Sequence, residues 1–163
     1  MWITTNRASS YPPPHSKLFM LIGEYLHTLD NKKRVAVPAK FRKEIGKKAV
    51  ITKGLDGCLV VYPFEEWKIV AEKLSNLPTG QLNNRNFVRI LLANASEAEI
   101  DSLGRILVPD YLKNHAELGE KVVMVGVYKR FEIWNEKRWE EYKSKVERET
   151  DALAEKLGEL GVY

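Results

Sequence analysis

The chain has 163 residues, of which 44% are hydrophobic, and a formal net charge of +4. This length is sufficient for one compact unit, or for two small halves that bury apolar faces against each other. The single cysteine, Cys58, excludes an internal disulfide, and no apolar run approaches the ~20 residues of a membrane-spanning helix. We therefore expect a soluble cytoplasmic protein with no membrane partner.

Residues 1–19 contain three consecutive prolines, several small polar side chains and no acidic residue. Such a composition buries little apolar surface and orders poorly. We predict that this range is a disordered extension outside the fold, or an artefact of the start site. The Leu-Ile-Gly-Glu-Tyr run that follows Met20 has the character of structured sequence.

The next part of the chain alternates short apolar runs with helical patterns. Val35–Val37 is a strand candidate, and Pro38 after it suits the first position of a helix, because no amide hydrogen is needed there. We expect that helix over Ala39–Ile45. Two strands joined by a glycine-containing turn and a longer helix are then expected at 49–53, 58–62 and 64–74.

The second half of the chain predicts the same succession. Residues 84–95 carry apolar side chains at helical spacing and are expected to form a bridging helix. A closing helix is expected from Glu136 onward, with an apolar stripe that packs on the chain's own core or contacts another subunit. Strands are expected at 106–108, 121–125 and 130–134, a short helix at 110–118, and Gly126 in the last turn.

An internal repeat accounts for this succession. The run Asp30-Asn-Lys-Lys-Arg-Val-Ala-Val-Pro38 matches Asp101-Ser-Leu-Gly-Arg-Ile-Leu-Val-Pro109 at an offset of 71 residues. We therefore predict an α+β fold of two pseudo-symmetric halves, with helices closing each half and a C-terminal amphipathic helix. The expected boundaries are 20–80 for the first repeat, 81–140 for the bridging helix and second repeat, and 141–163 for a helical tail.

Each copy of the repeat places an aspartate four residues before an arginine. Asp30 or Asp101 can accept backbone amide hydrogens in a tight turn and orient Arg34 or Arg105. Gly104 relaxes the second turn by tolerating positive φ. The turn then presents a rigid, forked cation, which can clamp a phosphate or lie against a guanine edge.

The two copies differ in charge. Residues 30–53 hold nine basic and two acidic side chains, whereas residues 101–121 hold three basic and four acidic ones. A basic patch is typical of nucleic-acid contact, so we assign contact with double-stranded DNA to the first copy. The second copy is interpreted as holding its own hairpin together. The candidate DNA-binding residues are Lys32, Lys33, Arg34, Lys40 and Arg42, and the motif-structural residues are Asp30, Pro38, Asp101, Gly104, Arg105 and Pro109.

The sequence offers little for catalysis. His27 and His115 are isolated, His15 lies in the N-terminal extension, and neither a phosphate-binding glycine loop nor metal-ligand spacing occurs. We predict that the protein is not an enzyme, and we expect no catalytic residue, no metal, no cofactor and no small-molecule substrate.

Two stretches resemble the motifs of the MraZ family: Gly23-Glu-Tyr-Leu-His-Thr-Leu-Asp-Asn-Lys-Lys-Arg-Val-Ala-Val-Pro-Ala-Lys-Phe-Arg42 and Ala95-Ser-Glu-Ala-Glu-Ile-Asp-Ser-Leu-Gly-Arg105. The resemblance implies an AbrB/SpoVT-like fold, with two split β-α-β halves in one chain. It also implies a nucleoid-associated homo-oligomeric ring that binds direct repeats upstream of the division and cell wall gene cluster and represses the operon containing its own gene. Family DNA contact maps to Arg34, with Lys32 beside it.

One departure and one alternative stay open. Where the family usually has glycine before the arginine, this sequence has Lys33, so either the turn is less relaxed or Lys33 itself contacts phosphate. AbrB-like domains also occur as antitoxins that bind a protein partner through an added tail, here within 140–163. Two full motif copies favour the DNA-binding regulator, because antitoxins usually resemble single copies.

Overall fold

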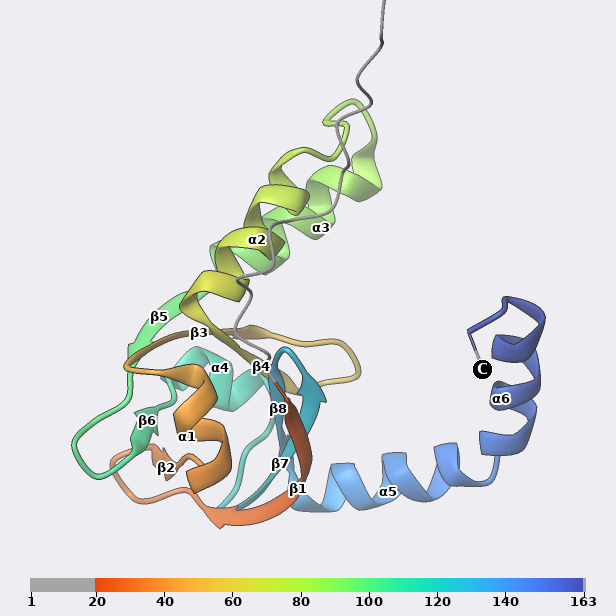
Figure 1. The fold of residues 1–163 in the computed structure, drawn as a ribbon. Coiled ribbons are helices and arrows are strands. Elements are labelled where there is room, and N and C mark those ends of the chain that lie inside the picture. Colours follow the sequence, from red (N-terminus) through yellow and green to blue (C-terminus); the bar gives the residue numbers. More distant parts are fainter. Residues whose placement is uncertain (1–19, 163) are drawn as a thin grey trace, which may run out of the picture.

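The computed structural model describes residues 20–162 (Figure 1), so the extension predicted over 1–19 lies outside the described residues. The strands are β1 (Leu21–Thr28), β2 (Arg34–Ala36), β3 (Lys48–Lys53), β4 (Leu59–Pro63), β5 (Ser96–Glu99), β6 (Arg105–Leu107), β7 (Lys121–Tyr128) and β8 (Phe131–Asn135). The helices are α1 (Ala39–Ile45), α2 (Phe64–Ser75), α3 (Leu82–Ala93), α4 (Asp110–His115), α5 (Glu136–Glu147) and α6 (Thr150–Glu159). The predicted α+β class is confirmed.

The two repeats exchange strands. The large sheet is antiparallel with the order β1-β7-β8-β4-β3-β5, so β1 of the first repeat pairs with β7 of the second, and β5 of the second pairs with β3 of the first. A separate two-stranded sheet pairs β2 with β6. Equivalent strands lie at equivalent places on either side of the β4–β8 pair. Each half therefore completes the other half's sheet.

The main core lies on one face of the large sheet. Side chains on a strand alternate between the two faces, and every second residue of the four central strands points to this core. The helices α1 and α4 and the β2–β6 ribbon cover it with Phe41, Leu112, Val35 and Ile106. The sheet contributes Ala49, Ile51, Leu59, Val61, Val122, Met124, Phe131 and Ile133, all fully buried.

The opposite face of the sheet carries a smaller core of Cys58, Val60, Val123 and Trp134. The pair α2 and α3 lies over β3 and β4, and α5 lies over β7 and β8 (Figure 1). Burial raises the pKa of the Cys58 thiol to about 12, and its Sγ donates to the Leu55 carbonyl at 3.2 Å. The single cysteine is therefore a neutral core side chain.

The repeated prolines mark the starts of α1 and α4. Pro38 and Pro109 each stand one residue before the first helical residue, at the N-cap, and not at the first helical position expected from the sequence. Their carbonyls accept the N–H groups of Phe41 at 2.8 Å and Leu112 at 3.1 Å. Because the first amides of a helix have no partner within it, proline here loses no hydrogen bond.

The closing helix expected as one continuous element is two helices, α5 and α6, which meet at a sharp bend (Figure 1). The Val146 carbonyl accepts the Glu149 N–H at 2.9 Å and the Thr150 hydroxyl at 3.1 Å. These bonds tighten the last turn of α5 and replace the next helical bond. Strands β1 and β5 were also not predicted from the sequence.

Gly126 lies inside β7, and not in the turn where it was expected. It pairs in register with Gly23 of β1, and a Cβ at position 126 would lie 2.6 Å from the carbonyl carbon of Leu21 and the amide nitrogen of Ile22. The turn instead follows Tyr128, whose φ is 71°. Glycine at position 126 therefore permits the close approach of β1.

We expect Gly126→Ala to destabilise the protein by about 1–3 kcal/mol, because the added methyl group must displace the backbone of β1. Gly119→Ala is the matched control, since a Cβ there meets nothing within 4 Å. Its effect should stay within about 0.5 kcal/mol. Urea unfolding of both variants measures the difference, and equal stabilities would contradict the close approach of β1 to β7.

Candidate nucleic-acid interface

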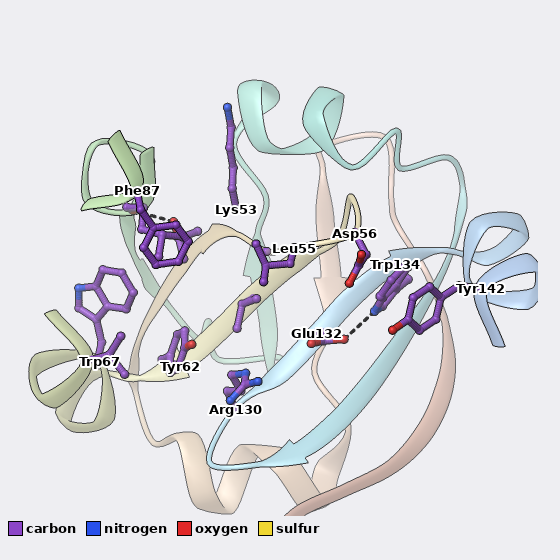
Figure 2. A pocket seen from close by; sticks show the side chains of 15 residues that line it. Lys53, Leu55, Asp56, Tyr62, Trp67, Phe87, Arg130, Glu132, Trp134 and Tyr142 are labelled. Carbon is purple, nitrogen blue, oxygen red and sulfur yellow. Dashed lines mark hydrogen bonds between the residues drawn. The ribbon is translucent and has the colours of Figure 1, made fainter. Parts of the chain in front are cut away.

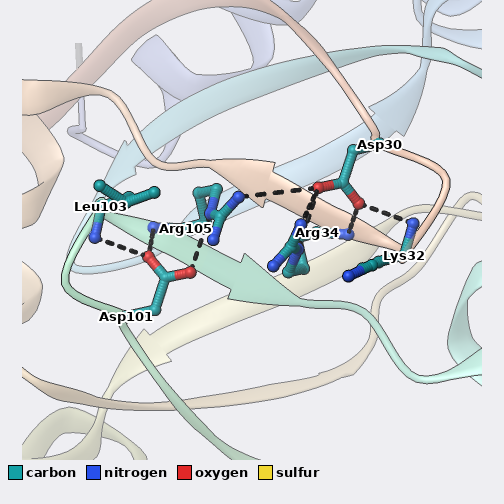
Figure 3. A network of polar contacts seen from close by, with 6 residues as sticks. All are labelled: Asp30, Lys32, Arg34, Asp101, Leu103 and Arg105. Atoms are coloured by element: carbon teal, nitrogen blue, oxygen red, sulfur yellow. Dashed lines mark hydrogen bonds and ion pairs between the residues drawn. The ribbon is translucent and has the colours of Figure 1, made fainter.

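The first motif folds as a tight turn that holds its arginine in place. Asp30 Oδ1 accepts the backbone N–H groups of Lys32 and Arg34, both at 2.9 Å. Asp30 Oδ2 accepts Arg34 Nε at 2.9 Å and Nη2 at 2.9 Å. One carboxylate thus closes the turn and orients the guanidinium (Figure 3).

The second motif repeats this geometry almost atom for atom. Asp101 Oδ1 accepts the N–H groups of Leu103 at 2.9 Å and Arg105 at 2.8 Å, and its Oδ2 accepts Arg105 Nε at 2.8 Å. Arg105 also extends toward Asp30, with 3.9 Å between its Nη1 and Asp30 Oδ2. The two motifs therefore form one polar network across the pseudo-symmetry axis (Figure 3).

The β2–β6 ribbon brings the two arginines to the same face. Val35 pairs with Ile106 at its centre, and both are fully buried. Arg34 and Arg105 flank this central pair, so they point away from the core. Their side chains retain 29% and 26% of their exposure. Arg105, interpreted from the sequence as holding its own hairpin, thus lies beside Arg34 on the outer face.

Lys33 adopts the backbone conformation of the glycine that it replaces. Its φ is 60°, close to the 75° of Gly104 at the equivalent position. Its ammonium pairs with Asp110 at the start of α4, with 2.6 Å between Nζ and Oδ2. Asp110 was not predicted from the sequence, because this partner lies 77 residues away in the chain. Lys33 therefore ties the first turn to the second repeat.

The other candidate cations lie around the ribbon. Lys32 is exposed in the first turn, and Lys40 is exposed on α1, where it lines a shallow hollow with Ile22. Arg42 lies against Gly104, and its side chain occupies the space that a Cβ on that glycine would need. The glycine in the second turn therefore makes room for an arginine of the first repeat.

Other kinds of site have little support within residues 20–162. No three His, Cys, Asp or Glu side chains in this range are grouped closely enough to hold a metal ion. Its helices are too short or too polar to cross a membrane. A hollow of about 320 Å³ lies on the other side of the large sheet, between α2, α3 and α5.

Hydrogen bonds hold both motif carboxylates in their charged form. The backbone N–H of Arg34 contributes most to lowering the pKa of Asp30, and the backbone N–H of Arg105 does the same for Asp101. Each arginine side chain lowers the pKa further, whereas desolvation opposes the shift. The turns are therefore stabilised only while these carboxylates are ionised.

A lowered pKa gives Asp30→Asn a defined pH dependence. The Asp30 carboxylate contributes stability above its unfolded-state pKa, and this contribution is lost as the pH falls through the folded-state pKa. Asp30→Asn should therefore be less stable than the wild type at about pH 7, and the gap should close toward about pH 3. Chemical unfolding at several pH values measures it. A stability difference that does not change with pH would contradict this role. Asp56→Asn is the control, since within residues 20–162 the Asp56 carboxylate forms no hydrogen bond or ion pair.

The positive φ of Lys33 predicts that two substitutions differ in their effect on stability. Left-handed backbone costs a non-glycine residue about 1–2 kcal/mol, whereas an exposed ion pair such as that with Asp110 contributes about 0–1 kcal/mol. Lys33→Gly should therefore change the free energy of unfolding by less than about 1 kcal/mol. Lys33→Val, which loses the same ion pair and adds a β-branched side chain, should destabilise by about 1–2 kcal/mol. Urea unfolding compares them, and a variant order with glycine less stable than valine would contradict the backbone argument.

Comparison with known proteins identifies the family. The family model described as "MraZ protein, putative antitoxin-like" matches twice, over residues 20–90 and 91–159. The chain is 48% identical to "Transcriptional regulator MraZ" of Pediococcus pentosaceus over 143 residues, covering 88% of this chain and 100% of the relative. It is 47% identical to the proteins of the same name from Caldanaerobacter subterraneus subsp. tengcongensis, over 143 residues, and Clostridium acetobutylicum, over 144 residues, with the same coverage.

These relatives are named as transcriptional regulators and not as enzymes, which confirms the predicted non-enzymatic class. The two tandem matches also confirm the predicted repetition of one domain. The two matches meet between residues 90 and 91. The domain boundaries expected from the sequence stay a prediction. With two family matches that together span most of its length, the chain belongs to the MraZ family of transcriptional regulators.

Proposed function

We propose that the protein is a sequence-specific DNA-binding repressor that reads DNA through the outer face of the β2–β6 ribbon. The observation that supports this most is the pair Arg34 and Arg105, oriented by carboxylates on one outward face. A two-stranded ribbon fits the major groove of B-form DNA, where arginine can donate two parallel hydrogen bonds to guanine. The ribbon therefore has the shape and the donors for base contact.

The aspartates prepare the arginines for such contact. A guanidinium has five N–H donors, and Asp30 takes those on Nε and Nη2 of Arg34. The remaining donors are free for a phosphate or a base edge. Because Asp30 already fixes the side chain, Arg34 loses less rotamer freedom on binding than an unrestrained arginine. Specificity then depends on the carboxylate as well as on the cation.

The basic side chains near the ribbon would supply attraction that does not depend on sequence. Lys32, Lys40 and Arg42 are exposed and belong to the segment that holds nine basic residues against two acidic ones. Contacts between such side chains and phosphates weaken as salt concentration rises, because releasing counterions from the DNA then gains less entropy. Lys33 contributes less in this proposal, since its ammonium already has Asp110 as a partner.

The target and the assembly follow from the family resemblance. The proposed target is a set of direct repeats upstream of the division and cell wall gene cluster, including the protein's own operon. The active form is a homo-oligomeric ring in the cytoplasm, associated with the nucleoid. One ribbon makes few contacts, whereas several ribbons on spaced repeats gain affinity through effective concentration.

The test is binding to DNA from upstream of the protein's own gene and to scrambled DNA of equal length, across a salt series. Arg34→Ala should lose about tenfold to a hundredfold of the preference for upstream DNA, since a bidentate base contact is worth about 1–3 kcal/mol. Arg105→Ala should lose preference in the same direction because its geometry is equivalent. Lys137→Ala removes an exposed cation from α5 and should leave the preference unchanged. Unaltered preference in both arginine variants, with the fold intact, would refute the ribbon as the reading surface.

An antitoxin-type protein partner is the second candidate. It is favoured by the antitoxin-like description of the family and by exposed leucines on α6. Co-purification of a small protein encoded beside this gene, bound through α6 and without preference for upstream DNA, would put this reading first.

A further inference from the structure

On the outer face of the large sheet, the second half lacks a helix at the place where α3 covers the first half. The helix α3 lies on β3 in the first half, where the buried Thr52 hydroxyl donates to the Leu91 carbonyl at 2.9 Å. In the second half α6 follows α5 as α3 follows α2, but α6 does not lie on the sheet (Figure 1). On this face, α2 and α3 therefore cover one part of the sheet and α5 covers another, with a gap between them.

This gap is a hollow of about 320 Å³ with aromatic walls (Figure 2). Trp67 and Phe87 of α2 and α3 line one side, and Trp134 and Tyr142 line the other. Tyr62 of β4 lies on its floor. Phe87 is 44% exposed and Tyr142 is 37% exposed, so apolar surface remains in contact with water. Surface of this kind is typical of a docking site.

The helix α6 and its C-cap residue Leu160 present an apolar face that the rest of residues 20–162 leaves exposed. Leu153, Leu157 and Leu160 recur at intervals of four and three residues, which places them on one side of the helix. Their exposed fractions are 41%, 43% and 75%. A helix of ten residues spans about 15 Å, short enough to lie within one face of a small domain. A helix this short is marginal in isolation, so its apolar stripe needs to pack against another surface.

We propose that α6 of one copy of this chain docks in the hollow between α2, α3 and α5 of a second copy. Its leucines would pack between Trp67 and Phe87 on one wall and Trp134 and Tyr142 on the other. This contact rests on the oligomer of the proposed function and names the surfaces that build it.

The helix α6 is acidic, whereas the hollow carries two basic and two acidic side chains. The helix α6 carries Asp151, Glu155 and Glu159 against the single cation Lys156. The hollow is lined by Lys53 and Arg130, and within residues 20–162 neither of these cations forms an ion pair. The lining also holds two carboxylates: Glu132 accepts the Trp134 indole N–H at 2.9 Å, and Asp56 forms no hydrogen bond or ion pair within residues 20–162. Lys53 extends away from the aromatic side chains, whereas Arg130 lies near Tyr62 (Figure 2). Arg130 is thus the cation best placed for a carboxylate of an incoming helix.

The connection to α5 explains why the occupant is a second copy. Only Arg148 and Glu149 separate α6 from α5, whereas 76–81 connect α2 to α3. The six-residue connection lets α3 return along α2 to the sheet. The two-residue connection directs α6 away from its own sheet at the bend (Figure 1). The same chain therefore offers both a helix and a hollow that its own helix does not fill.

A contact between two different surfaces of identical chains is heterologous, and repetition of such a contact produces rings when the rotation closes. Each copy would give one helix and receive one. The face that bears Arg34 and Arg105 lies on the opposite side of the sheet from the hollow, so this assembly leaves the ribbons free.

The experiment uses two complementary single variants of the full chain. Leu157→Glu places a charge on the apolar face of α6 and leaves the hollow unchanged. Phe87→Glu places a charge in the wall of the hollow and leaves α6 unchanged. Both side chains are more than 40% exposed, so both variants should fold. Light scattering coupled to size exclusion should give an oligomer for the wild type and a monomer for each variant alone. An equimolar mixture of the two variants should form a one-to-one dimer that grows no further.

The control is Leu82→Glu, which changes an exposed leucine of α3 outside the hollow and should keep the wild-type mass. An oligomer that persists in both variants would overturn the docking of α6 while leaving the ring in place. A monomeric wild type would overturn the ring and this contact together, and DNA preference would still be measured independently. If the mixture stays monomeric, or if Leu157→Glu alters tryptophan fluorescence in a monomer, the exchange between copies is wrong.

Discussion

The antiparallel pairing of β2 with β6 is the constraint on which the candidate site depends. Three residue pairs join two strands that lie 71 residues apart in the sequence, and the central pair, Val35 and Ile106, is buried in the main core. Because this pair is fixed by packing, the arginines on either side of it face outward together. The exchange of β1 and β5 between the repeats secures the same symmetry in the large sheet. Neither arginine could take its place if the two halves folded separately.

The two motif turns share their backbone conformation but differ in the contacts of their side chains. Lys33 and Gly104 share a left-handed conformation, yet Lys33 reaches across to Asp110 while Arg42 reaches across to Gly104. Both contacts run from the first repeat to the second. The first repeat therefore supplies the cations that hold the two turns together, as well as most of the exposed positive charge. The duplicated motif therefore forms one surface in which the first repeat contributes more positive charge than the second.

Local sequence patterns predicted most of the helices and strands. The elements and contacts that they did not predict depend on partners distant in the sequence. The helix over Ala39–Ile45 and the two closing helices begin where the prolines and apolar spacing indicated. Strands β1 and β5 were missed because their apolar alternation is weak and their partners are distant in sequence. The Asp-Arg turns were visible as a motif, but their proximity requires the β2–β6 register. At the end of α5 the Val146 carbonyl accepts the Glu149 N–H and the Thr150 hydroxyl, and hydrophobic periodicity does not reveal these bonds.

The two faces of the large sheet differ in completeness, and this difference relates the fold to its proposed assembly. On the inner face α1, α4 and the ribbon bury the apolar side chains that the central strands contribute to the main core, so the ribbon rests on a packed support. On the outer face the helices leave aromatic side chains partly exposed. Under the proposed function, one ribbon makes few DNA contacts, and other copies at defined spacing would raise the affinity. Because the incomplete face is the one that points away from the ribbon, copies can join there without covering the arginines.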